Sequence, residues 1–414
     1  MEGKGGTLKG ALTYPLFFFS SLALTLYIPI CCIMPIRVAE HFCVDNFIDS
    51  TILSYSIANT TVSAIISFFG GMKYGHYIFC LSLGSNSLIF ATFMIVIKFV
   101  EGNTGKYLYI ILMSFSGAFH ALGYTTSVPI ALKMYSPNGS SFNFGLLSGF
   151  VSFAFIFEYI EKTFNFDDRD EALKILLIFH SVPIILSIII TPIVYYLITI
   201  KFIVPDTSTS GNGFFVAING IKKAYPASLS ACLSIGVEIF FIPAIIPYAI
   251  GVNIDDAICI IKYDSVSMLV SSLFAFILSS LSQQNTNDDG RTEYKHGVDS
   301  KLFYFVLCFL TLTRIALLIP ALFFDEERDR SVLTNYIKCI VLYSGFVHGI
   351  SVGLGFDGIF PLNVTGLIKD GTDNESYKSG VSSAVRAAEL TAILFSCSIT
   401  FASICTKLYF LINK

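Results

Sequence analysis

The sequence has 414 residues, of which 54% are apolar and only 13% are Asp, Glu, Lys or Arg, with a formal net charge of −3. Soluble domains carry about 25% charged residues, so a chain this apolar cannot cover a globular surface with polar side chains. The slightly acidic balance also argues against a nucleic-acid partner. The composition therefore predicts an integral membrane protein in direct contact with the lipid bilayer.

Apolar stretches long enough to cross a bilayer follow one another along the whole chain. A helix needs about 20 residues to cross a hydrocarbon core about 30 Å thick. We therefore predict an all-α polytopic protein with eleven transmembrane helices, at residues 11–36, 51–72, 77–100, 107–133, 143–163, 172–203, 226–251, 258–283, 302–324, 333–358 and 379–411.

A polar stretch near the middle of the chain divides these helices into six and five. We place a six-helix bundle at residues 1–203, a connector at 204–225 and a five-helix bundle at 226–414. Lys and Arg are spread about evenly over the two sets of loops, so they select no orientation. With the N-terminus in the cytoplasm, the connector is cytoplasmic too, and we expect the plasma membrane rather than an internal one.

Motifs for catalysis and metal binding are missing from the sequence. The ten cysteines form no CxxC pair and show no Cys/His ligand spacing. No GxxxxGK[ST] loop, GxSxG elbow or HExxH helix is present. We therefore expect no enzyme activity, no metal, no cofactor and no direct use of ATP.

Several ionisable side chains lie inside the predicted spans, where each costs about 2.5–3.5 kcal/mol at the bilayer centre. They are Glu238, Asp264, Arg314, Asp357, Arg386 and Glu389, joined by His120 and His348. Two interpretations are open: buried ion pairs that hold helices in register, or a polar path that meets a substrate. Glycines and prolines beside Asp357 and Glu238 favour the second, because broken helices line the cavities of many transporters.

Glycines also recur at positions 345, 349 and 353, which share one face of a predicted helix. This spacing lets two helices approach closely, so we interpret it as a packing surface.

Local sequence patches add a resemblance to the 6+5 layout. Ser114–His120 leads through Pro129 to Ser136–Gly139 and then to the Gly-bearing stretch Phe144–Gly149, and Thr313–Pro320 holds an arginine six residues before a proline. In layout and in these patches the chain resembles the equilibrative nucleoside transporter family, as a divergent member. The resemblance implies two bundles of the major-facilitator type and alternating access to a substrate site between them.

The family's site residues carry over in part. Its eighth helix holds an acid, here Asp264, but the arginine expected four residues later is Met268. Asp264 must then pair with Arg314 or Arg386, carry a proton, or meet the substrate directly. His120 lies near the position of a substrate-binding glutamine. The expected substrate-binding set is Asp264, His120, Tyr124, Tyr27, Glu238, Arg314 and Asp357.

The expected function is therefore facilitative transport of nucleosides, nucleobases or both, with proton coupling as an open alternative. Purine and pyrimidine substrates both remain possible. Two other classes stay open as well. One is a transporter of another superfamily for a sugar, a vitamin or an amino acid, and the other is a membrane receptor or scaffold that transports nothing.

Overall fold

The computed structural model describes residues 3–68, 75–134, 138–163, 168–200, 213–246, 254–286, 292–294, 297–320, 330–369 and 374–412. Almost all of them are helical. The helices are α1 (Gly3–Thr25), α2 (Tyr27–Phe42), α3 (Ile48–Phe68), α4 (Gly75–Phe99), α5 (Gly102–Met134), α6 (Asn138–Thr163), α7 (Arg169–Thr199), α8 (Gly213–Phe240), the π-helical turn η1 (Phe241–Ile245), α10 (Ile254–Ser282), α11 (Lys301–Leu318), α12 (Arg330–Asp357), α13 (Ile359–Lys369) and α14 (Asn374–Ile412). A short antiparallel pair, β1 (Gln283–Thr286) and β2 (Thr292–Tyr294), follows α10.

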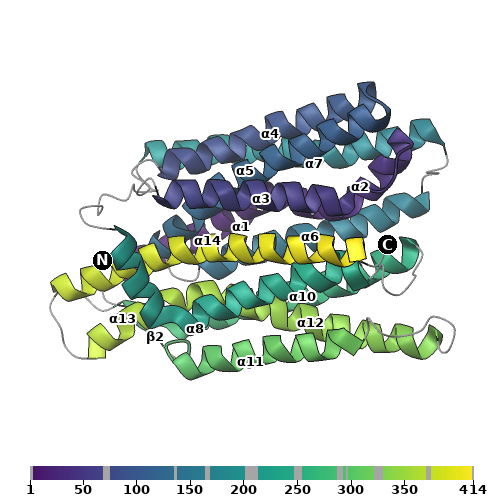
Figure 1. Ribbon diagram of the computed structural model, residues 1–414. Coiled ribbons are helices and arrows are strands. Elements are labelled where there is room, and N and C mark those ends of the chain that lie inside the picture. The colour runs from purple at the N-terminus through teal and green to yellow at the C-terminus, as the bar shows by residue number, and fades with distance from the viewer. Residues whose placement is uncertain are drawn as a thin grey trace.

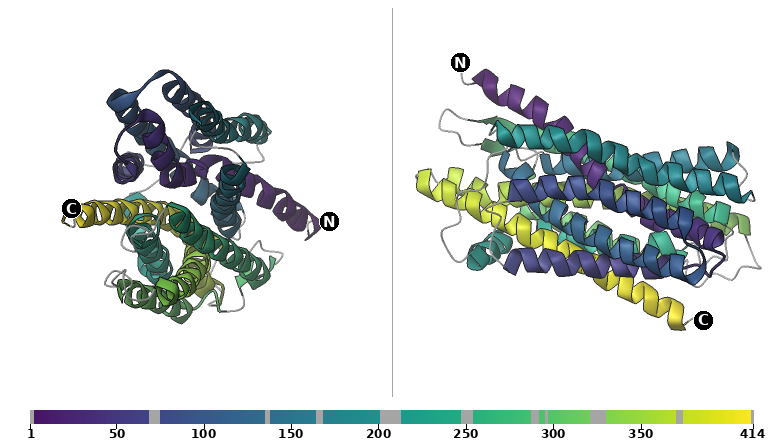
Figure 2. Two further views of the ribbon diagram at one scale, coloured as in Figure 1. Left: turned by 90° about the vertical axis from the view of Figure 1, so that its right-hand side faces the viewer. Right: turned by 90° about the horizontal axis from the view of Figure 1, so that it is seen from above.

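The long helices run side by side and form two bundles (Figure 1). An N-terminal bundle contains α1–α7, and a C-terminal bundle contains α8–α14; the end-on view in Figure 2 separates the purple and blue helices from the green ones. The bundles meet along two seams. At one seam α6 packs against α10 and α12, and at the other α14 packs against α3 and α5.

Each of the eleven predicted segments overlaps a helix of the structure. Within the described residues, seven helical stretches are long and apolar enough to cross a membrane, those of α4, α5, α7, α10, α11, α12–α13 and α14. The helical membrane class is thus confirmed, while the number of eleven spans stays a prediction. Helices α3 and α6 are richer in Ser, Thr, Asn and Gly, which make up more than a third of each.

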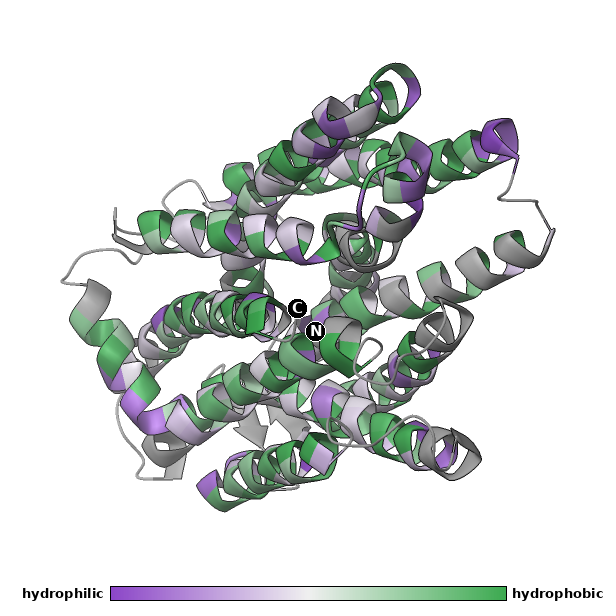
Figure 3. Cartoon of the chain, turned by 45° about the vertical axis from the view of Figure 1, so that its right-hand side comes forward, coloured by the Kyte–Doolittle hydropathy of each residue, from purple (hydrophilic) through white to green (hydrophobic). Residues whose placement is uncertain are grey.

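The distribution of side chains is inverted relative to a soluble protein. Large apolar side chains such as Leu88, Ile188, Phe309 and Phe401 are exposed on the outer faces of the bundles. Figure 3 shows the hydrophobic colour along the helices and hydrophilic colour gathered near their ends. Many serine, threonine and asparagine side chains are buried instead. An apolar exterior of this extent fits lipid as the surrounding solvent.

The apolar core follows the two bundles. One cluster lies entirely within the N-terminal bundle and includes Phe93, Tyr109 and Phe179. A second cluster joins both bundles, because it contains Leu24 and Tyr124 from one side and Phe356 and Phe395 from the other. The interface between bundles is therefore a packed core in its own right.

Three local features differ from the simplest sequence prediction. The first predicted span is two helices, α1 and α2, which meet at Leu26 rather than at a proline. Helix α8 begins at Gly213, so about half of the predicted connector continues a helix, because apolar residues alternate with Lys222 and Lys223 there. The rest of the connector lies outside the described residues. Finally, α12 and α13 are separated at Gly358, next to Asp357.

Glycine spacing has the packing role expected of it. The stripe Gly345, Gly349 and Gly353 on α12 faces Asp264, Met268 and Ala275 on α10. A Cβ atom on Gly345 would lie 2.5 Å from the carbonyl oxygen of Asp264. The absence of side chains on this stripe brings α12 and α10 into close contact.

Candidate functional site: a buried charge cluster and an aromatic cluster

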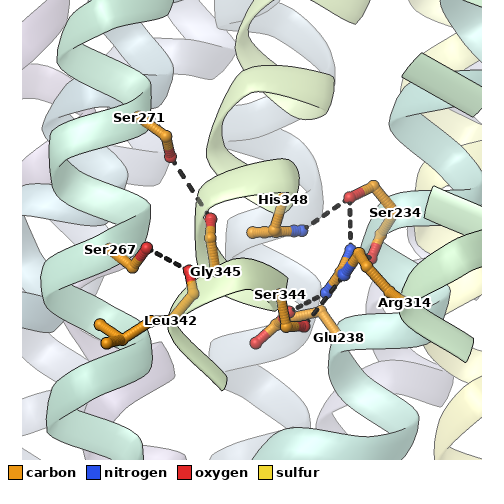
Figure 4. Close-up of polar contacts among 9 residues, drawn as sticks. All are labelled: Ser234, Glu238, Ser267, Ser271, Arg314, Leu342, Ser344, Gly345 and His348. Atoms are coloured by element: carbon orange, nitrogen blue, oxygen red, sulfur yellow. Dashed lines mark hydrogen bonds and ion pairs between the residues drawn. The ribbon is translucent and has the colours of Figure 1, made fainter. Parts of the chain in front are cut away.

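Three of the predicted site residues, Glu238, Asp264 and Arg314, come together inside the C-terminal bundle. Arg314 of α11 forms an ion pair with Glu238 of α8, and the side chain of Arg314 is completely buried (Figure 4). Its Nη1 donates to the Ser234 hydroxyl at 2.8 Å, and its Nε donates to the Ser344 hydroxyl at 2.9 Å. The guanidinium is thereby held by groups from α8 and α12, in a geometry suited to its fixed fork of donors.

Asp264 of α10 is the third member of this charge cluster. Its side chain is buried and interacts electrostatically with both Glu238 and Arg314. Within the described residues, its Oδ1 atom has no hydrogen-bond partner. Gly345 leaves room for the carboxyl, since a Cβ there would lie 2.8 Å from Oδ1. Arg314 thus lies near Asp264, but the ion pair that it forms is with Glu238.

The other arginine considered for Asp264 is engaged elsewhere. Arg386 forms an ion pair of 2.7 Å with Glu389 on the same helix, α14.

The charge cluster contains one more acidic group than basic groups, because the ion pair uses only one of its two carboxyls. Glu238 and Asp264 supply two carboxyls, while Arg314 supplies one guanidinium. His348 lies beside them, with its Nδ1 3.1 Å from the Ser234 hydroxyl. An uncompensated charge buried in a bilayer costs several kcal/mol, so a neutral cluster needs one bound proton or one cation.

A second polar group lies in the N-terminal bundle around His120 of α5. Its Nδ1 is hydrogen-bonded to the Tyr55 hydroxyl and lies 3.1 Å from Nδ2 of Asn59. Asn59 Nδ2 also donates to the Tyr55 hydroxyl at 3.3 Å. Tyr55 and Asn59 were not among the sequence candidates, although both are polar residues four positions apart on one face of α3.

Tyr124 lies one helical turn beyond His120 and belongs to an aromatic cluster between the bundles. This cluster consists of Tyr124 on α5, Phe142 on α6, Phe356 on α12 and Phe395 on α14. The rings of Tyr124 and Phe395 are stacked, with centroids 5.7 Å apart and planes 18° apart. Since these two rings come from different bundles, their contact spans the interface.

Asp357 is placed at the other seam. Its carboxylate accepts hydrogen bonds from the backbone N–H of Ser140 at 3.0 Å, from the Ser140 hydroxyl, and from the Ser279 hydroxyl at 2.6 Å. These donors come from α6 and α10, so Asp357 joins the two bundles. The remaining sequence candidate, Tyr27, starts α2, and its side chain lies outside the described residues.

These features define a multi-pass helical membrane protein with two bundles, a buried charge cluster in one of them and an aromatic cluster between them. No protein-family model matches the chain, and no curated protein matches its sequence.

Three solved structures of transporters are similar to this chain. The outward conformation of the Major Facilitator Superfamily transporter FucP is 15% identical over 95% of this chain and 97% of its own, with a TM-score of 0.49. A single-residue variant of the fucose:proton symporter FucP of E. coli is 13% identical over 95% and 97%, with a TM-score of 0.47. A bacterial homologue of the iron transporter ferroportin is 11% identical over 96% of both chains, with a TM-score of 0.46.

Proposed function

We propose that the protein is a transporter that moves a small polar solute across the membrane as its two bundles alternate in exposing a central site. The observation that carries the proposal is Asp264, a second buried carboxyl beside an ion pair that is already complete. A pair that only fixed helices would need no further acid. Buried ionisable groups inside membranes are costly, and they commonly mark substrate or ion pathways.

The seams between bundles support movement of this kind. Across the α3–α14 seam several contacts are pairs of small hydroxyl side chains, such as Ser56 with Ser403 at 3.0 Å and Thr60 with Thr400 at 2.6 Å. Such contacts are short, directional and easily exchanged for water. Two bundles joined in this way can separate at one end while staying in contact at the other.

For the substrate, the proposal follows the family resemblance and names nucleosides or nucleobases. A site for a flat base and a polyhydroxyl sugar needs apolar walls and a few hydrogen-bonding groups. The aromatic cluster supplies ring faces, and an ionised Asp264 is a strong acceptor for the donating hydroxyls of ribose.

The unbalanced charge cluster favours proton-linked transport as a specific form of this proposal. Two carboxyls against one guanidinium leave room for one proton. Substrate and proton could then bind together and cross together. Purely facilitative transport remains the alternative form, in which the extra charge is neutralised by substrate contacts alone.

The test is uptake of radiolabelled adenosine, uridine, hypoxanthine and glucose by cells that express wild type, Asp264→Asn or Glu101→Gln. Glu101 pairs with Arg169 on the surface, where both side chains are more than half exposed, so its variant is a matched loss of one carboxylate. We expect saturable nucleoside or nucleobase uptake that Asp264→Asn abolishes and Glu101→Gln keeps. Loss of uptake on adding a protonophore would support the proton-linked form.

Absence of uptake of all four solutes, from protein shown to reach the cell surface, would overturn the nucleoside proposal. Uptake that survives Asp264→Asn at wild-type rates would remove Asp264 from the site.

A further inference from the structure

We infer that Tyr124, Phe395 and Asn59 form the part of the substrate site that receives a flat heteroaromatic ring, and that Asn59 favours rings with an N–H donor at their edge. The inference rests on the proposed function and deepens it by naming the residues that select the base. Tyr124 was already in the substrate-binding set expected from the sequence, whereas Phe395 and Asn59 were not.

The first step concerns the stacked pair. Tyr124 and Phe395 face each other almost in parallel, at a centroid distance of 5.7 Å, across the interface of the bundles. The edge of Phe356 contacts both rings, at 5.9 Å from Tyr124 and 5.5 Å from Phe395. Phe142 closes another side, with its ring at 63° to that of Tyr124. The nearly parallel rings of Tyr124 and Phe395 are thus bordered by two further rings, those of Phe356 and Phe142.

A base can enter this frame when the bundles separate slightly. A ring placed between two others needs a centroid distance of about 7 Å, twice the usual contact distance of carbon atoms. The observed pair is therefore closed on itself, and the two rings must move apart before a base can enter between them. Because α5 and α14 belong to different bundles, the movement that exposes the site also supplies this space. The stacked pair then occupies the ring site while the interface is closed.

The second step concerns the polar edge beside the pair. His120 contacts the ring of Tyr124 at 5.4 Å and is itself held by Tyr55 and Asn59. The Nδ2 group of Asn59 is used by these two contacts. Its Oδ1 atom is buried and has no hydrogen-bond partner in the part of the chain that the structure describes.

A buried carbonyl oxygen without a donor is unfavourable unless a ligand supplies one. Oδ1 is an acceptor, so the complementary ligand atom is an N–H or O–H donor. On a nucleobase, the exocyclic amino groups of adenine and cytosine and the ring N–H of hypoxanthine or uracil meet this requirement. A site that combines ring faces with a hydrogen-bond acceptor is suited to a nucleobase.

The experiment measures competition for adenosine uptake by two matched ligands, adenosine itself and its N6,N6-dimethyl derivative. The derivative keeps the ring and the ribose but has no N–H on the amino group. We expect wild type to prefer adenosine by about tenfold, as sites that hydrogen-bond a substrate group reject the analogue without it. Asn59→Leu should reduce this ratio to near one by weakening adenosine binding. Asn59→Asp keeps an acceptor and should retain most of the preference.

A second arm tests the ring faces. Phe395→Leu removes one face of the stack and should raise the KM for adenosine about tenfold, since each stacked base depends strongly on its aromatic partner. Phe90→Leu serves as the control, because Phe90 is a fully buried ring of the N-terminal bundle away from the interface. Each variant is first checked for its amount in the membrane and for its melting temperature after purification.

The outcomes separate the inference from the function on which it rests. Adenosine uptake that keeps its preference in Asn59→Leu, or that has an unchanged KM in Phe395→Leu, overturns the inference and leaves the transport function standing. Absence of any nucleoside or nucleobase uptake by wild type overturns both.

Discussion

Asp357, the last residue of α12, accepts hydrogen bonds from both the backbone N–H and the hydroxyl of Ser140 in the first turn of α6. A carboxylate at this position also neutralises the positive end of the α6 dipole. At the start of α3, Lys407 of α14 forms an ion pair with Asp49. Because successive long helices run in opposite directions, the N-termini of α6 and α3 lie at opposite ends of the bundle interface. Each end of that interface is thus joined by one charged contact.

The Asp357 contact predicts a shift in conformation when it is lost. Asp357→Asn should weaken the closure of the interface at the α6 end and expose residues on that face. Asn143, buried one turn beyond Ser140, is a suitable reporter. A cysteine placed there by Asn143→Cys should react faster with a thiol reagent in the Asp357→Asn background than in the Lys407→Met background, which loosens the other end. Equal rates would contradict the assignment of Asp357 to this end.

Breaking the buried ion pair should strongly destabilise the C-terminal bundle. Arg314→Ala leaves two carboxyls without their cation, and removing one partner of a buried pair costs about 3–5 kcal/mol. The double variant Glu238→Gln, Arg314→Gln should recover much of this loss, because a single carboxyl, that of Asp264, then remains in the cluster and one bound proton makes it neutral. The melting temperature is measured with a thiol-reactive dye, for which the buried Cys80, Cys232 and Cys308 report unfolding. A double variant less stable than Arg314→Ala would show that the pair does not act as a unit.

Gly345 should tolerate no side chain. Gly345→Ala places a methyl group against the carbonyl and carboxyl oxygens of Asp264 and against Ser267, so α10 and α12 must move apart. We expect a loss of about 1–3 kcal/mol in stability, as for overpacking in a tight core, together with impaired transport. Gly84→Ala is the control, because its new Cβ would lie 3.5 Å from Thr191 Cγ2, an ordinary contact. Similar behaviour of the two variants would argue against close packing at Gly345.

The sequence predicted the helices and the cost of their buried charges more readily than the contacts among them. Hydropathy located the apolar segments because lipid imposes a length and a polarity on each of them. It also singled out Glu238, Asp264 and Arg314, since ionisable groups are rare inside spans. The pairing of Arg314 with Glu238 joins residues 76 positions apart on different helices, which no local pattern encodes.

Two residues of the candidate site, Tyr55 and Asn59, could not be found from the sequence. Tyr55 and Asn59 are uncharged, so a search for charged residues inside spans did not select them. Their role depends on contacts with His120, which lies on another helix and is held in place by them. The break between α1 and α2 falls at Leu26, three residues before Pro29, so that the proline lies in the first turn of α2, where it is tolerated.

Transport by the purified protein is the most direct test of the central proposal. Proteoliposomes are loaded with unlabelled adenosine, diluted, and given radiolabelled adenosine outside, with protein-free liposomes alongside. We expect the label to accumulate transiently above its external concentration, since a carrier with alternating access exchanges one substrate molecule for another. Label that enters no faster than into protein-free liposomes, and likewise for uridine and hypoxanthine, would contradict the proposal that this protein is a nucleoside or nucleobase transporter.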